Sequence, residues 1–204
     1  MKHYNFKEDE MSEVFFTSDT HFYHSNIIKF CERPFSCAEE MNNCIIYNWN
    51  KTVPKEGIVF HLGDFAFCGV ESMKFILSQL NGHIILIKGN HDYRNIRESV
   101  YSYFGDIYSS KEIIVDNTRV YLNHYPYLCF PQENSIQLFG HIHLSKYKNE
   151  GYDFERSKYL QSNQYDVGVD LNDFTPVSWN TIKSRIAYQK AYHCNCTNWI
   201  KNGT

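Results

Sequence analysis

The sequence predicts an α/β fold with a largely parallel sheet, and two observations support this. Short apolar runs at 13–18, 57–62 and 83–88 alternate with segments of helical periodicity. Each run also stops at side chains able to bind a metal ion or carry a proton. Because ligands gather beyond the carboxyl ends of parallel strands, the sequence predicts a site along one edge of this sheet.

The three runs have the composition of strands that are buried on both faces. They are rich in β-branched and aromatic residues, with little alternation between apolar and polar positions. Helices are predicted between and beside them, over 25–30, 38–51 and 71–80. In the last of these helices, the spacing predicts that Phe75, Ile76 and Leu80 face inward.

The second half of the sequence predicts a hairpin, two further strands and a final helix. The hairpin turns at Asp116-Asn117-Thr118, and Ser178 is the expected cap of the final helix. The other predicted strands are 136–139 and 165–169, and the final helix covers 178–190. One domain is therefore predicted over 13–190, with a polar lead-in at 1–12 and an unpatterned tail at 191–204.

Composition restricts the classes of protein that fit. A chain of 204 residues can bury one substantial core, and a net charge of -3 argues against a surface for bulk nucleic-acid binding. The sequence begins with no secretory-type apolar segment, and no run approaches the roughly 18 apolar residues of a membrane span. With seven Cys, at least one is unpaired, so the sequence predicts a cytoplasmic protein with free thiols and no membrane partner.

Five predicted strand ends carry side chains of related chemistry. They hold Asp19 and His21, then Asp64, then Asn90, His91 and Asp92, then His124, then His141 and His143. Imidazole, carboxylate and amide oxygen are the ligands of Mn, Fe, Zn, Co and Ni, and the absence of Cys argues against a structural thiolate zinc site. Each fragment alone is common, but their joint placement indicates a metal centre.

In this order, the motifs resemble the calcineurin-like metallophosphoesterase superfamily. They are Asp-x-His, Gly-Asp, Gly-Asn-His-Asp, a single His and Gly-His-x-His, and together they extend from Asp19 to His143. The segments 18–24, 33–35, 48–50 and 61–65 further resemble the small single-domain phosphoesterases of bacteria and phages. This resemblance implies a four-layer α/β/β/α sandwich, in which two mixed sheets are flanked by helices.

The resemblance also implies two divalent metal ions, about 3.5–4 Å apart. Manganese is the expected metal, with Fe, Zn, Ni or Co as alternatives. The first ion would be bound by Asp19, His21, Asp64 and His143. The second would be bound by Asp64, Asn90, His124 and His141, so that Asp64 bridges the two.

The resemblance assigns catalysis to His91, which would donate a proton to the leaving oxygen as a metal-bound hydroxide attacks phosphorus. Asp92 is expected to orient His91 and favour its protonated form, and Gly89 to permit a sharp turn. His24 and Arg33 are candidate contacts to the substrate phosphate, and Asp170 is a candidate support for a ligand. For the last three, a purely structural role remains an alternative.

Departures from the superfamily's subgroups narrow the predicted substrate. Segment 63–69 reads Gly-Asp-Phe-Ala-Phe-Cys-Gly, which lacks the second Asp and the Arg of the protein Ser/Thr phosphatases, and Asp92 replaces their Glu. Connections around His124 are short, so an open site is expected, with 146–164 as the one candidate lid.

The sequence therefore predicts a phosphodiesterase that acts on nucleotides or nucleic-acid ends. The alternatives are a broad phosphomonoesterase or nucleotide phosphatase, and a non-catalytic binding scaffold of the same fold. The intact ligand set and His91 disfavour the scaffold. The sequence makes no prediction of an oligomeric state.

Overall fold

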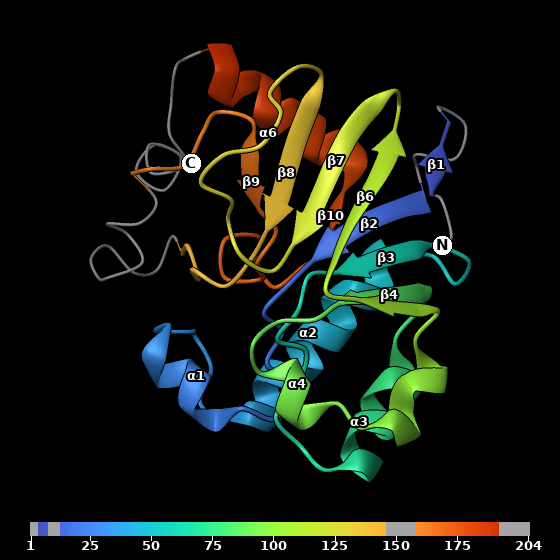
Figure 1. Ribbon diagram of the computed structural model, residues 1–204. Helices are drawn as coiled ribbons and strands as arrows, with labels where there is room; N and C mark the ends of the chain where they lie inside the picture. Colours follow the sequence, from blue (N-terminus) through green and yellow to red (C-terminus); the bar gives the residue numbers. More distant parts are fainter. Residues whose placement is uncertain (1–3, 8–12, 146–157, 192–204) are drawn as a thin grey trace.

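Two five-stranded mixed sheets pack against each other and carry helices on their flanks (Figure 1). The computed structural model describes residues 4–7, 13–145 and 158–191. Most of the predicted lead-in and tail, and the greater part of the candidate lid at 146–164, therefore lie outside the described residues. The arrangement is that of a single α/β domain, as predicted.

The first sheet contains the three strands that were predicted to be parallel. Its order is β10 (Val177–Ser178), β2 (Val14–Thr17), β3 (Ile58–His61), β4 (His83–Ile87) and β5 (Asp106–Tyr108). Neighbours from β2 to β5 are parallel, and β10 is antiparallel to β2. The carboxyl ends of β2, β3 and β4 consequently meet at one edge.

Both faces of this sheet are buried, which explains its nearly continuous apolar runs. Phe15 and Val59 belong to the cluster shared with the helices, whereas Phe16 and Phe60 belong to the cluster shared with the second sheet. The helices on this side are α1 (Ser25–Phe30), α2 (Ala38–Thr52) and α3 (Val70–Gln79). Among the described residues, no helix has the length and apolar character needed to cross a membrane.

The prediction that Phe75 faces inward on α3 is wrong. Phe75 is 59% exposed, whereas Met73, Ile76 and Leu77 are buried. The buried positions follow the i, i+3, i+4 spacing of a helix face that starts at Met73, which leaves Phe75 on the opposite side. The buried face of α3 is therefore defined by Met73, Ile76 and Leu77 together, and not by Phe75.

The second sheet contains the predicted hairpin. Its order is β1 (Asn5–Phe6), β6 (Ser110–Val115), β7 (Thr118–Asn123), β8 (Ser135–Phe139) and β9 (Gln164–Asp166). Asp116 and Asn117 have φ of 50° and 56°, the left-handed pair that a tight two-residue hairpin requires. β7, β8 and β9 are parallel, so the ends of β7 and β8 reach the same edge. The predicted lead-in contributes to the fold, because Phe6 in β1 is buried.

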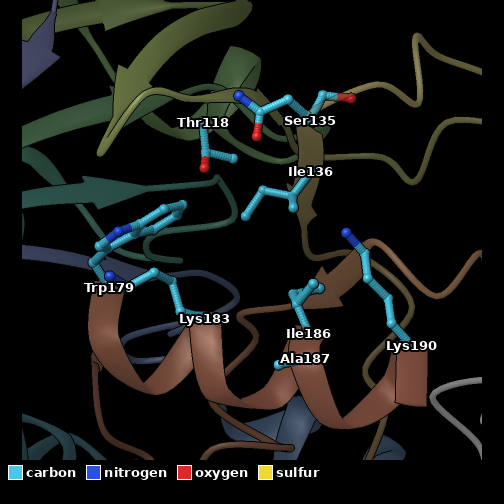
Figure 2. Close-up of a pocket in the computed structure, with 9 residues that line it drawn as sticks. Thr118, Ser135, Ile136, Trp179, Lys183, Ile186, Ala187 and Lys190 are labelled. Atoms are coloured by element: carbon cyan, nitrogen blue, oxygen red, sulfur yellow. The ribbon is translucent and has the colours of Figure 1, made fainter. Parts of the chain in front are cut away.

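Three further elements complete the described chain: α4 (Asp92–Asn95), the 3₁₀ helix η2 (Glu98–Tyr103) and α6 (Trp179–Ala191). The Ser178 hydroxyl accepts a hydrogen bond from the Thr181 N–H, as its predicted capping role requires. A cavity of about 340 Å³ lies between α6 and the beginnings of β7 and β8 (Figure 2). None of the predicted site residues lines it, so the predicted chemistry belongs to the other end of these strands.

Candidate metal centre

The predicted site residues gather where strand ends of both sheets meet. The Asp19 N–H donates to the Gly63 carbonyl at 2.9 Å, which joins the ends of β2 and β3. The His141 N–H donates to the Asp19 carboxylate at 3.0 Å, which joins the second sheet to the first. A single constellation therefore forms from segments more than a hundred residues apart in the sequence.

Among the described residues, the side chains able to hold a metal ion form three groups. One of them joins His143 to Cys31 and Asp170, and the other two contain the predicted ligands, so we call these two the first and second half-sites. The first half-site comprises Asp19, His21 and His143, and the second comprises Asp64, His124 and His141. Within each group the ligand atoms lie within 4.8 Å of one another. Asp64 lies between them, since its Oδ2 is 3.6 Å from His21 Nε2 and 3.4 Å from His124 Nε2.

Asn90 joins the second half-site. Its Oδ1 lies 3.1 Å from His124 Nε2. Asn90 is exposed to solvent, whereas Asp19 and His21 are almost completely buried. The structure thus brings together every residue that the resemblance assigned to a metal ion, in the same two groups.

The geometry of His21 fits a bound cation. Its Nε2 is buried and has no hydrogen-bond partner among the described residues. It faces Asp19 Oδ1 at 4.0 Å and Asp64 Oδ2 at 3.6 Å, which is too far for hydrogen bonds. Two donors bound at about 2.1 Å to one ion lie roughly 3–3.5 Å apart, so small adjustments would let these atoms share an ion.

Five of the assigned ligands have a left-handed backbone. The φ angles are 56° at Asp19, 48° at His21, 57° at Asp64, 72° at His141 and 47° at His143. Such conformations cost about 1–3 kcal/mol each in non-glycine residues and persist only where surrounding contacts enforce them. Their concentration at these positions indicates a site in which ligand direction is imposed by the fold.

Two motif glycines are required by close approach of neighbouring groups. A Cβ at Gly140 would overlap Ser18 Oγ and Asp19 Oδ2. A Cβ at Gly89 would overlap Asp64 Oδ1 and lie 2.7 Å from the Asp64 nitrogen. A turn does follow Gly89, but Gly89 has no left-handed φ, so its close approach to Asp64 is what requires a glycine here.

Hydrogen bonds behind two of the histidines fix which nitrogen faces the centre. His124 Nδ1 donates to the Leu62 carbonyl at 2.7 Å, and His143 Nδ1 donates to Asp170 Oδ2 at 2.9 Å. In each ring, Nε2 is then left to face the carboxylates of the centre. Burial alone would lower the pKa of His124, but Asp64 and Asp19 raise it to about 9.

Asp92 has a different position from the one predicted. Its buried carboxylate accepts hydrogen bonds from the N–H groups of Asp64, Phe65 and Gly89, at 2.8, 2.9 and 2.8 Å. Burial raises the pKa of Asp92 to about 6, although the Gly89 and Phe65 N–H groups oppose this rise. The Asp92 carboxylate thus binds the backbone that carries Asp64. This contact corrects its predicted role, which was to orient His91.

His91 lies at the mouth of the centre. Its side chain is 43% exposed, and its Nε2 is 3.8 Å from Asp64 Oδ2, the oxygen near both half-sites. The His91 N–H donates to Asp64 Oδ1 at 3.0 Å, and its ring packs against Phe67 with centroids 4.6 Å apart. A half-exposed imidazole in this position can reach a group bound over the centre.

The two candidate substrate contacts differ in their placement. His24 is partly buried, and its ring stacks on Phe67 with centroids 3.9 Å apart; burial, then the nearby His91 charge, lowers its pKa. Arg33 is only 4% exposed, and its guanidinium binds Asp170 at 2.7 and 2.8 Å. Arg33 therefore does not face the site entrance, which corrects its predicted contact with substrate phosphate.

Sequence reasoning missed two residues close to the centre. Phe67 packs between His24 and His91, but an isolated Phe after Gly63-Asp64 gives no signal of this position. Asp166 is fully buried, with a pKa raised to about 7, first by burial and then by the Asp19 charge. Asp166 is the last residue of β9, but the predicted strand ran over 165–169, which placed Asp166 inside a strand and not at its end.

The chain belongs to the calcineurin-like phosphoesterase family, whose model matches residues 13–184. This membership confirms the resemblance carried by the motifs, and the family typically uses divalent metal ions. The fold, with two mixed sheets flanked by helices, is the one that the family predicts.

Several individual proteins are similar to this chain. An uncharacterized protein of Methanocaldococcus jannaschii, MJ1445, is 49% identical over 84 residues, which are 40% of this chain and 48% of that protein. The match thus spans about half the length of that relative. The crystal structure of AQ665 from Aquifex aeolicus, a protein of unknown function, has 30% identity and a TM-score of 0.66, covering 84% of this chain and 97% of that one. The Pseudomonas putida nuclease MPE has 17% identity and a TM-score of 0.43, covering 66% and 63%.

Proposed function

We propose that this protein is a dinuclear-metal phosphodiesterase that acts on nucleotides or nucleic-acid ends, with His91 as the proton donor. The observation that carries the proposal is the position of His91. Its half-exposed imidazole lies 3.8 Å from Asp64 Oδ2, the oxygen between the two half-sites. A proton donor at the entrance of a metal centre is the arrangement that ester hydrolysis needs.

The proposed ligands are Asp19, His21, Asp64 and His143 for one ion, and Asp64, Asn90, His124 and His141 for the other. When bound, two divalent ions, for which we propose manganese, supply Lewis-acid charge for the phosphoryl oxygens and activate the attacking water. Only Asp19 and Asp64 bring negative charge to this ligand set. Two carboxylates against two divalent cations leave a positive centre, which attracts a phosphate ester.

His91 then has a defined task. Cleavage of the phosphorus–oxygen ester bond leaves negative charge on the departing oxygen, and the His91 imidazolium neutralises it by donating a proton. Contact with Phe67 on one side and the hydrogen bond from its own N–H to Asp64 hold the residue at the entrance. Neutral His91 would regain its proton from solvent, to which 43% of its side chain is exposed.

Features around the entrance favour a diester that carries nucleobases. Tyr125 is 44% exposed, and its ring meets the ring of His141 edge to face, with centroids 4.6 Å apart. Tyr93, one residue after Asp92, is 63% exposed. Stacking of a base on an aromatic ring contributes about 1–3 kcal/mol, so these exposed rings could hold the bases of a diester.

A hydrolysis screen with added Mn²⁺ tests the proposal. It compares bis-p-nitrophenyl phosphate with p-nitrophenyl phosphate, and then 2′,3′- with 3′,5′-cyclic nucleotides. We expect the diester to be preferred. A strong preference for the monoester would identify a phosphomonoesterase, and no turnover by a protein that binds both ions would identify a non-catalytic scaffold.

A further inference from the structure

Arg33 is a buried cation, and each of its three guanidinium nitrogens donates to a group behind the first half-site, although Nη1 also contacts Met41 Sδ at 3.2 Å. Its Nε donates to Asp170 Oδ1 at 2.7 Å and its Nη2 to Asp170 Oδ2 at 2.8 Å, which forms a bidentate ion pair. Its Nη2 also donates to the Asp19 carbonyl at 2.7 Å, and its Nη1 to the Thr20 carbonyl at 3.2 Å. One side chain thus contacts both the turn that carries Asp19 and the carboxylate of Asp170.

Asp170 extends this contact to a third segment. Its Oδ2 accepts the hydrogen bond from His143 Nδ1 at 2.9 Å, which leaves His143 Nε2 directed at Asp19 Oδ1, 3.7 Å away. Burial alone would raise the pKa of Asp170, but the charge of Arg33 and the His143 hydrogen bond hold this pKa well below its usual range. Asp170 is therefore an ionised carboxylate between a cation and an imidazole.

The segments joined in this way are under backbone strain, as are Asp64 and His141 of the second half-site. Asp19, His21 and His143 have φ of 56°, 48° and 47°, and the carbonyls of Asp19 and Thr20 within this strained turn accept the hydrogen bonds of Arg33. The second half-site is held without this pair, because Asp92 binds the backbone around Asp64 and His124 rests on the Leu62 carbonyl.

We infer that Arg33 and Asp170 form a positioning pair that presets Asp19, His21 and His143 for one metal ion. Without the pair, His143 is free to rotate and the turn at Asp19 is free to relax, so the first half-site loses affinity. The second half-site keeps its own supports. This inference rests on the proposed metal centre, and it assigns neither residue to substrate.

The test uses the full chain and Mn²⁺ alone. Titration calorimetry gives the stoichiometry and both dissociation constants, and electron paramagnetic resonance distinguishes a coupled Mn pair from a single Mn ion. We expect two ions in the wild type and, in Asp170→Asn, an affinity for one ion that is weakened about 10–100-fold, with a single-ion spectrum at limiting Mn²⁺. Arg33→Lys should give a smaller loss in the same direction, because an ammonium cannot form the bidentate pair.

A matched control separates positioning from general charge loss. Asp116→Asn removes the ion pair with Lys183, of length 2.8 Å, at the hairpin between β6 and β7. This variant should bind two ions with wild-type affinity.

Single variants leave one buried charge unpaired and can fail to fold, so the double variant Arg33→Met/Asp170→Asn removes both charges together. Circular dichroism reports whether it is folded. A folded double variant that binds two ions with wild-type affinity overturns the inference. A wild type that binds no ion overturns the proposed function itself, which is a distinguishable result.

Discussion

The two half-sites hold similar ligands but are supported in different ways. Behind the first, the buried Arg33–Asp170 pair connects segments that are 137 residues apart in the sequence. Behind the second, the Asp92 carboxylate gathers three backbone N–H groups of neighbouring turns. The two half-sites therefore have the same types of candidate ligand at their strand ends. The groups that orient those ligands differ between the two half-sites.

Exposure also differs between them. Asp19 and His21 are 0% and 1% exposed, whereas Asn90 is an exposed residue. Each half-site has two buried side chains and one partly buried histidine, and the exposed Asn90 is what opens the second toward the entrance where His91 lies. Substitutions in either half-site, or at the Asp64 that lies between them, should therefore have different effects.

The largest effect is expected at the shared residue. Asp64→Ala removes the oxygen that lies near His21 and His124, so both ions should be lost. Loss of several kcal/mol of charge stabilisation should reduce hydrolysis by about 10³-fold or more. Elemental analysis measures the ions per chain, and retention of two would contradict the shared position of Asp64.

His91→Ala should reduce kcat by about 10²–10⁴-fold while both ions stay bound. The reason is the missing proton at the leaving oxygen, so the loss should be largest for esters of poor leaving groups and smallest for p-nitrophenyl esters. Steady-state kinetics on both ester types measures this difference. An equal loss for both, or a loss of metal, would show that His91 has another role.

Gly140→Ala should weaken the first half-site most. The added Cβ would overlap Ser18 Oγ and Asp19 Oδ2, so the Asp19 carboxylate must move, although the His141 N–H is also hydrogen-bonded to it. We expect the affinity for one ion to fall about 10–100-fold, as when a ligand loses its support. Gly69→Ala is the matched control, because its Cβ meets nothing within 4 Å, and it should bind Mn²⁺ as the wild type does. Unchanged binding by Gly140→Ala would sink this assignment.

Asp92→Asn should lower the folding stability and disturb the second half-site, which contains Asp64. The new amide group can accept from fewer of the N–H groups of Asp64, Phe65 and Gly89, and a buried donor left unpaired costs about 1–3 kcal/mol. Urea unfolding measures the decrease in the free energy of unfolding. Wild-type stability in this variant would show that the carboxylate does not hold these turns.

The smallest effect concerns pH. His61 is fully buried, its Nδ1 accepts the Gly63 N–H at 3.2 Å, and burial lowers its pKa to about 3. The unfolded chain takes up this proton below about pH 6.5, whereas the folded chain does not. This contribution to stability is therefore full above pH 6.5 and declines as pH falls toward 3. The difference in unfolding free energy between the wild type and His61→Asn should shrink from pH 7 to pH 5; a constant difference would contradict this.

Much of this structure could be predicted from local patterns. The strands β2, β3 and β4 are short apolar runs that end in ligand-type residues, and parallel strands place such ends side by side. The order of these ends, together with the family resemblance, also predicted which side chains lie close together in the two half-sites.

What could not be predicted depends on contacts between distant segments. Nothing near Arg33 in the sequence indicates that its partner is Asp170, so a phosphate contact was an equally reasonable reading. Asp92 was assigned to its neighbour His91, but its side chain turns under the loop of Asp64. The edge strands β1, β5 and β10 have two or three residues each, too few to show a period.

The central claim is that two ions share Asp64 between the two half-sites. A crystal structure of the protein grown with Mn²⁺, with anomalous scattering measured near the manganese edge, tests it most directly. Two anomalous peaks are predicted, one contacting Asp19, His21 and His143, the other contacting Asn90, His124 and His141, and both contacting Asp64. A single peak, or two peaks of which one does not contact Asp64, would contradict the account.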